Sequence, residues 1–245
     1  MIKFFRKIRY DLMEKNKTGK YFKYAIGEIV LVVIGILIAL QINNWNELNK
    51  IDLVRQSYYE QLINDLDKDS INIQKYIIIL ENSINTFEKY LDKLETPDLE
   101  IEEVLNELGD IQVTYSIITF NTNTSDILMS TGDIELIPTN IRNSLLEITR
   151  NQSSLKNIRD QIDAEYLNLI MKVKSLGFST HSSPLKNQKK LTELLNVNEN
   201  NREIILGLDA AFWLKNFSEK DRVSIFNEML VEIENAKRKI KSEMK

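Results

Sequence analysis

The longest apolar stretch in the chain runs from Ala25 to Ile42, eighteen residues in which only Glu28 and Gln41 are strongly polar. A hydrocarbon core of about 30 Å needs roughly 20 helical residues to cross it. Tyr24 and Trp45 flank the stretch, at the positions where aromatic side chains meet a membrane interface. The pattern therefore predicts a transmembrane helix over residues 25–45.

Two alternatives compete for this stretch. A cleaved signal peptide has an apolar region of about 7 to 15 residues and a small-x-small cleavage site, whereas this run is longer and continues into Gln-Ile-Asn-Asn-Trp. A buried hairpin helix of a soluble protein is disfavoured, because the run is apolar around its whole circumference and its flanks differ strongly in charge. We therefore expect an uncleaved signal anchor.

The pattern changes after the apolar run, but nothing stops the helix. No glycine occurs between Gly35 and Gly109, and no proline occurs before Pro97. The core positions then recur at alternating steps of three and four, as in a helix packed on one side. They are Tyr59, Leu62, Leu66, Asp69, Ile73, Ile77, Leu80, Ile84, Phe87, Leu91 and Leu94. We expect one helix from Ala25 to about Glu95, with a break at Asn43–Asn46 as the alternative, because asparagine favours helix ends.

Glycine, proline and capping patterns place the later helices. We expect a short helix from Leu99 to Leu108 closed by Gly109, a long one from Thr139 to about Leu176 closed by Gly177, and two more. The last two start near Arg202 and Glu219, after Asn200-x-x-Glu203 and Ser218-x-x-Asp221. The expected core positions of the long helix are Ile141, Leu145, Ile148, Leu155, Ile158, Ile162, Leu169 and Val173, and those of the last helix are Val223, Phe226, Met229, Leu230, Ile233 and Ile240. The apolar loop DIELIP between Gly132 and Pro138 should pack inward.

Composition agrees with long helices. Seven glycines and three prolines in 245 residues are too few for a sandwich, a barrel or a glycine-rich nucleotide fold. The sequence predicts an all-α fold, in which an N-terminal transmembrane helix continues into a long stalk helix and an exported antiparallel bundle of about four long helices.

The side chains that chemistry usually requires are scarce. The chain has no cysteine, and its one histidine, His181, lies in the serine-rich loop from Phe178 to Gln188. Asp65, Asp67 and Asp69 resemble the start of a calcium loop, but serine and tyrosine occupy its sixth and twelfth places, so we expect a solvated helix face. An aromatic cluster of Phe212, Trp213 and Phe217 is interpreted as core. We therefore expect no enzyme, no catalytic residue, no cofactor and no metal.

Charge sets the orientation. Residues 1–24 carry eight basic and two acidic side chains, whereas residues 46–245 carry 24 basic and 33 acidic ones. The positive-inside rule then keeps residues 1–24 in the cytoplasm and exports 46–245, to the periplasm in a bacterium, and the acidic balance argues against nucleic acid as a partner. The basic segment either lies on membrane lipid as an amphipathic helix or is only a topology signal. Its first cations are Lys3, Arg6, Lys7 and Arg9.

Small and polar residues of the apolar run share one helix face. This seam consists of Ala25, Glu28, Val32, Gly35, Ala39 and Ile42, spaced by three or four residues. Gly35 and Ala39 would let two backbones approach closely, which is how membrane helices associate. A carboxyl costs about 2.5 kcal/mol or more if it faces lipid near the centre, so a partner helix would favour burial of Glu28 in the seam. The alternatives for Glu28 are pairing with Lys20 or Lys23, or a pore or proton pathway.

Three sequence blocks carry a resemblance. MIKFFRKIR, YAIGEIVLVVIGILIALQINNWNE, and ILMSTGDIELIP followed by IRNSLLEI resemble an uncharacterised family of bacterial single-span membrane proteins, a domain of unknown function. The resemblance implies a role beyond hydrophobicity for Gly27, Glu28, Gly35, Gln41, Asn43, Asn44 and Trp45. It implies a bacterial inner membrane and a periplasmic helical domain, and brings no reaction, substrate or cofactor.

The sequence predicts three regions: a cytoplasmic basic segment (1–24), a transmembrane helix (25–45) and a periplasmic helical domain (46–245). We expect a non-enzymatic inner-membrane scaffold or adaptor that forms a homo-oligomer through its span and stalk, with a further protein partner in the same membrane as a second option. The alternatives are a periplasmic ligand sensor and a subunit of a membrane channel or transport complex.

Overall fold

A computed structural model describes residues 10, 18–111, 118–178 and 187–244. The chain divides into two compact units, Met1–Ser57 and Tyr58–Lys245. Within the described residues every regular element is helical, which confirms the all-α class. The basic segment with Lys3, Arg6, Lys7 and Arg9 lies outside the described residues, as does His181.

The first described helix is α2 (Thr18–Leu94), which begins before the apolar run and ends one residue short of the expected Glu95. Asn43 to Asn46 lie within this helix, so the alternative with a break there is not observed. No proline or glycine interrupts the backbone at this point, and an ion pair one turn later, Lys50 to Glu47 at 2.9 Å, links neighbouring turns.

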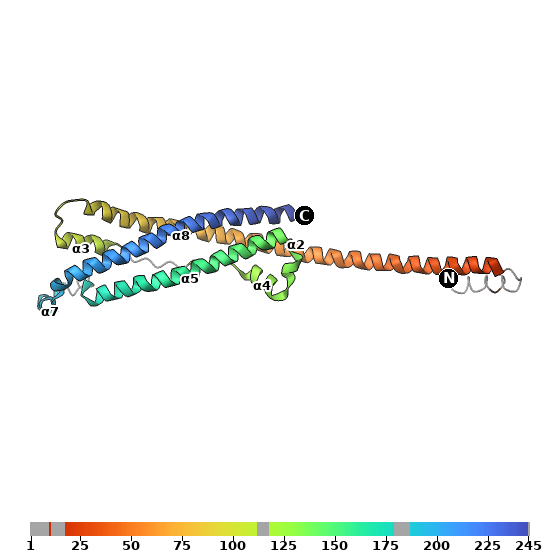
Figure 1. The fold of residues 1–245 in the computed structure, drawn as a ribbon, viewed down its shortest axis with the longest axis horizontal. Helices are drawn as coiled ribbons and strands as arrows, with labels where there is room; N and C mark the ends of the chain where they lie inside the picture. Colours follow the sequence, from red (N-terminus) through yellow and green to blue (C-terminus); the bar gives the residue numbers. More distant parts are fainter. Residues whose placement is uncertain (1–9, 11–17, 112–117, 179–186, 245) are drawn as a thin grey trace. The chain divides into compact units, whose positions relative to one another are not determined.

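Tyr58–Lys245 contains the rest of the described helices. They are α3 (Ile101–Asp110), α4 (Asn123–Thr131), the 3₁₀ turn η1 (Asp133–Leu136), α5 (Thr139–Ser175), α7 (Lys189–Leu194), the 3₁₀ turn η3 (Val197–Asn200) and α8 (Asn201–Glu243). The long helices in the described part of this unit are therefore α5, α8 and the part of α2 from Tyr58 onward (Figure 1). The sequence predicted about four long helices.

The difference in number arises at Ser218, which was expected to cap a new helix. Ser218 lies inside α8, where its buried hydroxyl accepts a hydrogen bond from Nε of Arg222 at 3.0 Å. The side chain is therefore engaged with a partner one turn ahead and caps nothing. The start expected near Arg202 is confirmed, although the Asn200 side chain donates to the carbonyl oxygen of Leu176 at 2.9 Å and makes no cap bond of its own.

Two other helix ends test the glycine signals. Gly177 follows α5 with a φ of 110°, a conformation that glycine adopts without strain, so this end is confirmed. Gly109 lies inside α3 and does not close it. α3 also starts later than expected, because Glu100 sits at the N-cap and its backbone N–H donates to the Glu103 carboxylate at 3.2 Å.

Interhelical pairs give the helix directions. Lys237 of α8 reaches Asp67 of α2 at 2.6 Å, and Lys220 of α8 reaches Glu88 at 2.7 Å, so α8 runs antiparallel to this part of α2. α8 also runs antiparallel to α5, since its Glu232 accepts from Asn151 and its Arg222 pairs with Asp163. α2 and α5 therefore point the same way (Figure 1). α4 and η1, which precede α5, lie beside the start of this part of α2, since Thr124 donates to Asp65 at 2.6 Å and Tyr58 donates to Asp133 at 2.6 Å.

Two apolar clusters hold the three helices together. One joins α2, α5 and the second half of α8 around Tyr59, Ile73, Ile141 and Ile233, and the other joins α2, α3, α5 and the first half of α8. The second includes Phe87, Leu108, Tyr166, Val173, Ile204 and Phe212. All three long helices therefore contribute to both clusters.

The predicted core positions of α5 are only partly right. Ile141, Leu145, Ile148, Leu155 and Val173 are buried. Ile162 and Leu169 are half-buried, because Tyr166 and Ile170 occupy the inward positions, and the side chain of Ile158 lies outside the described residues. Tyr166 follows Leu155 by eleven residues, three helical turns, and so shares its face.

Of the predictions for shorter segments, one is confirmed and one is partly wrong. Ile137 is buried and Ile134 and Leu136 are half-buried, so the DIELIP loop packs inward as expected. The aromatic cluster was wrong in two of its three members, because Phe212 is buried but Trp213 and Phe217 are exposed. Trp213 still makes a T-shaped contact with the buried Phe87 of α2, with ring centroids 5.6 Å apart.

Candidate functional site

The apolar run in Met1–Ser57 is the first candidate site. Every large aliphatic side chain from Ile26 to Ile42 is exposed in the single chain, for example Ile36 at 62%. Among the described residues, one helix is long and apolar enough to cross a membrane, judged by length and composition, and it contains this run. Side chains of this kind remain uncovered in water only at a large free-energy cost, so the run is compatible with a membrane anchor.

The structure places all six seam residues in one unbroken helix. Ala25 and Glu28 are half-buried, and Val32, Gly35, Ala39 and Ile42 are exposed. Apart from the adjacent residues and the backbone of its own helix turns, a Cβ added at Gly35 would meet no described atom within 4 Å, and the same holds at Gly27. Packing within the described chain therefore does not explain either glycine, and the association of seams stays a prediction.

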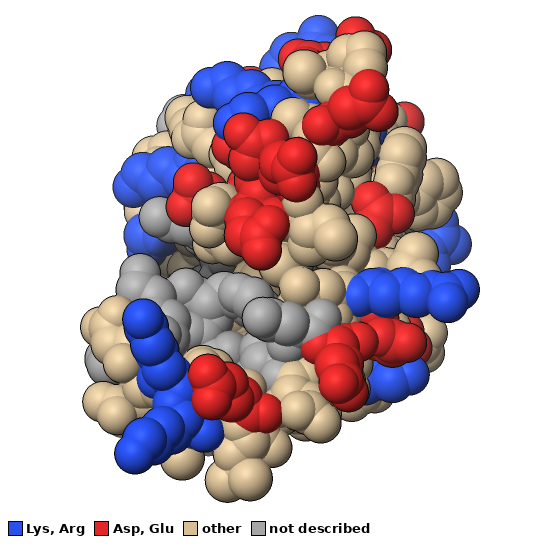
Figure 2. Space-filling model, turned by 90° about the vertical axis from the view of Figure 1, so that its left-hand side faces the viewer, with Lys and Arg blue, Asp and Glu red and all other residues tan. Residues whose placement is uncertain are grey.

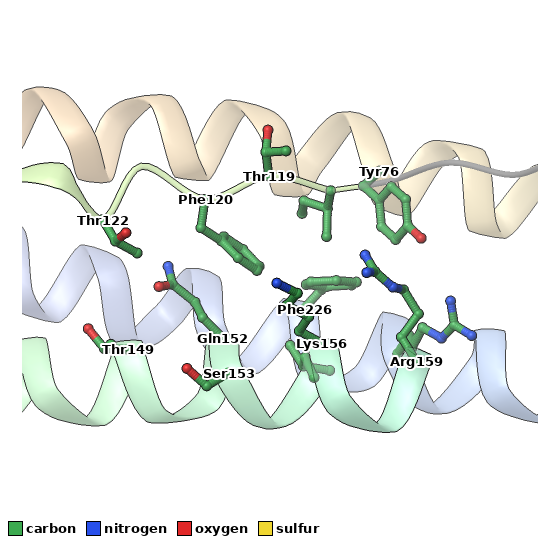
Figure 3. Close-up of a pocket in the computed structure, with 13 residues that line it drawn as sticks. Tyr76, Thr119, Phe120, Thr122, Thr149, Gln152, Ser153, Lys156, Arg159 and Phe226 are labelled. Atoms are coloured by element: carbon green, nitrogen blue, oxygen red, sulfur yellow. The ribbon is translucent and has the colours of Figure 1, made fainter. Parts of the chain in front are cut away.

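The second candidate site is a cavity of about 330 Å³ inside Tyr58–Lys245. Its walls come from α2, from residues 118–122, from α5 and from α8, and Figure 3 shows residues 119–122 above it with α5 below. The cavity lies at the low end of the range of about 300–1,000 Å³ for ligand pockets.

Aromatic and aliphatic side chains form most of the cavity wall. Phe120 points into it from the connecting segment, and Phe226 approaches from α8 (Figure 3). The rings of Phe226 and Tyr76 make an edge-to-face contact with centroids 5.4 Å apart and an interplanar angle of 82°. Burial raises the pKa of the Tyr76 hydroxyl, against the opposing effect of the nearby Arg222 guanidinium, so this phenol stays neutral.

Three cationic side chains also line the cavity, and two of them have acidic partners. Nη2 of Arg222 donates to Asp163 at 2.9 Å, and Arg159 donates to Asp160 at 2.7 Å while lying 3.9 Å from Asp163. Lys156 forms no ion pair or hydrogen bond within the described residues. No carboxylate is among the described lining residues.

The polar residues at the other end of the cavity are largely occupied. The Gln152 amide donates to Asp69 at 3.0 Å, and the Thr122 hydroxyl donates to Asp126 at 2.8 Å. The Thr149 hydroxyl donates to a backbone carbonyl one turn back, at 2.9 Å. These groups hold the wall together, which leaves Lys156 as the cation available to a ligand within the described lining.

The three aspartates of DLDKDS do not converge on a metal. Asp65 accepts from Thr124 of α4 at 2.6 Å, Asp67 pairs with Lys237 of α8, and Asp69 accepts from Asn121 and Gln152. Asp65 and Asp69, one turn apart, both accept hydrogen bonds from residues 121–124, and only Asp67 faces another element, so the three are only partly spread around the helix. The solvated-face interpretation is wrong for Asp69, which is 1% exposed. Among the described residues no cluster of three metal-ligating side chains occurs.

The surface charge at the end that carries α3 and α7 is mixed. Figure 2 shows acidic and basic side chains interspersed over this face. Opposite charges this close cancel at a distance, so the described residues of this face form no single-sign patch that would attract a charged polymer.

The cavity was not predicted from the sequence. The cationic lining residues are Lys156, Arg159 and Arg222, and each lies within four residues of a core position. Basic residues beside the apolar stripe of an amphipathic helix ordinarily extend into solvent, so they gave no sign of a cavity. The one available signal was Arg222, which falls four residues before Phe226 and therefore on the buried face of α8.

Comparisons with known proteins bring no activity. No solved structure matches the chain. An uncharacterized protein of Plasmodium falciparum (isolate 3D7) is 26% identical over 197 residues, which cover 76% of this chain but only 18% of that protein. The chain thus spans about a fifth of the length of this relative.

A family model places the chain more specifically. It matches residues 28–154, from Glu28 in the apolar run to the middle of α5, and is described as a family of unknown function, DUF6090. The matched region excludes the opening MIKFFRKIR and all of α8. Because the match covers more than half of the residues, the chain belongs to this family of unknown function.

Proposed function

We propose that this protein is a non-enzymatic scaffold or adaptor, anchored in a bacterial inner membrane by residues 25–45, whose copies associate through the seam from Ala25 to Ile42. In this proposal its helical domain is exported. The observation that carries the proposal is the open space around Gly35 within α2.

Glycine in a helix interior is less favourable than alanine by about 1 kcal/mol. At Gly35, apart from the adjacent residues and the backbone of its own helix turns, no described atom lies within 4 Å of the position that a Cβ would take. The residue therefore needs another explanation, and close approach of a second helix supplies one, because small residues let backbones touch in lipid. Ala39 follows four residues later on the same face and extends the contact.

The direct test is the mass of the full-length protein extracted into lipid nanodiscs, with every copurifying chain identified. We expect a defined multiple of one 28.6 kDa chain. The variant Gly35→Leu should shift the population to single copies, whereas Gly27→Leu, an equally uncrowded glycine on another face of the helix, should not. Glu28→Gln should weaken the assembly less than Gly35→Leu.

Each other outcome excludes part of the proposal. A single copy bound to another protein would exclude self-association and leave the adaptor role. Equal effects of Gly35→Leu and Gly27→Leu would exclude the seam as the contact face. Ion conductance that disappears in Glu28→Ala would favour a channel subunit instead.

Orientation has its own test. The chain contains no cysteine, so single cysteines introduced as Asn16→Cys and Ser242→Cys can be labelled selectively. With a membrane-impermeant maleimide applied to spheroplasts, we expect Ser242→Cys to react and Asn16→Cys to react only after lysis. The opposite pattern would reverse the proposed topology.

A further inference from the structure

We propose that the cavity between α2, α5 and α8 binds a small molecule with a flat apolar body and one anionic head group, a carboxylate or a phosphate, and that Lys156 binds this head group. The inference concerns a site outside the membrane anchor and is independent of self-association.

The size of the cavity limits the ligand. A volume of about 330 Å³ suits a compact molecule of one or two fused rings and is too small for an intact membrane lipid. Residues 118–122 form one wall and three helices the others, so the ligand would be enclosed on several sides (Figure 3).

The shape and chemistry of the wall select an apolar body with a π-face. Phe120 and Phe226 point toward the same space (Figure 3), and Tyr76 lies edge-on to Phe226. Aromatic pairs gain about 0.5–1.5 kcal/mol beyond simple burial when their rings stack with an offset or meet edge to face. Leu155 and Ile118 complete an aliphatic boundary that an uncharged ring can fill.

The charges in the cavity wall favour a ligand with a single negative charge. Asp163 and Asp160 already balance Arg222 and Arg159, so these two ion pairs together contribute little net charge. Lys156 remains as one unbalanced cation within the described lining, and Figure 3 shows its amino group reaching from α5 toward Phe226. An anionic head group would pair with it, and Ser153, one turn earlier on the same face of α5, can donate a second hydrogen bond.

The experiment uses the full-length protein in nanodiscs of zwitterionic lipid, with empty nanodiscs as the blank. Isothermal titration compares 2-naphthoate, 2-naphthyl phosphate, the uncharged 2-naphthamide and the cationic 2-naphthylmethylammonium. We expect the two anions to bind, the amide to bind more weakly and the cation not to bind. The ratio of the carboxylate to the phosphate affinity then identifies the preferred head group.

Variants separate the head-group contact from the apolar contact. Lys156→Met should weaken binding of the anions about tenfold and leave the amide unchanged, because it keeps the length of the side chain and removes only its charge. Lys172→Met, sixteen residues further along α5 and also exposed, is the matched control and should change nothing. Ser153→Trp should abolish binding of all the probes by filling the cavity.

Three results would overturn the inference. One is the absence of measurable binding of both anions at millimolar concentration. Another is an equal affinity for the anions and the amide, which would remove the role of charge. The third is equal weakening by Lys156→Met and Lys172→Met, which would show that the anions respond to the general charge of α5.

Discussion

The apolar side chains of α2 meet two different surroundings along a single helix. Between Ile26 and Ile42 they are exposed in the single chain, whereas from Tyr59 to Tyr90 its inward side chains are buried by α5 and α8. The two stretches differ in apolar content, which is far higher in the first, and also in how the apolar positions are spaced. The spacing differs because the first stretch is apolar on every face of the helix. The second stretch has one apolar stripe and charged or polar residues on its other faces.

Each stretch also contains one carboxylate in its apolar face. Asp69 is buried, and three donors satisfy it: the backbone N–H and side-chain amide of Asn121, both at 2.7 Å, and the amide of Gln152 at 3.0 Å. Glu28 lies in the seam and is only half-buried within its own chain. The helical domain thus satisfies its buried carboxylate with neighbouring segments, whereas the proposed seam would bury Glu28 against a second copy.

The largest expected effect is a matched pair of isoleucine truncations. Ile73→Ala should lower the free energy of unfolding of Tyr58–Lys245 by about 4 kcal/mol, because Ile73 is fully buried between three helices. Ile36→Ala, at a side chain 62% exposed in the single chain, should leave that value unchanged. Urea unfolding in nanodiscs, followed by near-ultraviolet circular dichroism, measures both. A similar loss in the two variants would mean that the apolar run is part of the domain core.

The next effect concerns a buried ion pair in α8. Lys215 and Glu219 of α8 lie 3.7 Å apart, too far for a hydrogen bond, with side chains 11% and 6% exposed, and the Lys215 ammonium lies 5.3 Å from the centroid of the Tyr166 ring. Glu219→Leu should cost about 3 kcal/mol, since it leaves a buried cation without its partner.

The double variant separates the ion pair from the packing. Lys215→Met combined with Glu219→Leu should recover most of that loss or exceed the original stability, because both desolvated charges are removed together. Denaturant midpoints of the two single variants and the double variant form the cycle. Additive losses would show that the two charges do not interact.

A smaller effect contrasts the two carboxylates. Asp69→Ala should lower the free energy of unfolding by about 2 kcal/mol, because it leaves donors of Asn121 and Gln152 buried without an acceptor, although relief of the buried charge offsets part of the loss. Glu28→Ala should leave unfolding of Tyr58–Lys245 unchanged and act only on the copy number in nanodiscs. Loss of domain stability in Glu28→Ala would contradict the separation of the two stretches.

Periodicity predicted most of the fold because the spacing and end signals of a helix lie within its own sequence. The ends of α5 and the burial of Phe226, Ile233 and Ile240 follow from spacing and from Gly177. Ser218 shows the limit of prediction from local patterns. A serine at this position is compatible with a helix cap and also with a helix interior in which it accepts a hydrogen bond from Arg222. Arg222 in turn pairs with Asp163 on another helix, which the local sequence does not reveal. The cavity could not be predicted for the same reason, because its walls come from segments about 30 to 150 residues apart in the sequence.

The smallest expected effect is a pH dependence in α8. Burial raises the pKa of the Glu219 carboxyl above its ordinary 4.5, although Lys215 and a hydrogen bond from Ser83 oppose the shift. The folded state therefore keeps this proton to higher pH than the unfolded state, so the contribution of Glu219 to stability is full below pH 4.5 and falls as pH rises through the raised pKa. Glu219→Gln cannot titrate and lacks this component. The difference in unfolding free energy between the original protein and Glu219→Gln, measured by urea titration at successive pH values, should favour the original protein most at acid pH and shrink as pH rises. If the difference instead grows in favour of the original protein as pH rises, attraction to Lys215 outweighs burial, and the pair stabilises the domain as a salt bridge.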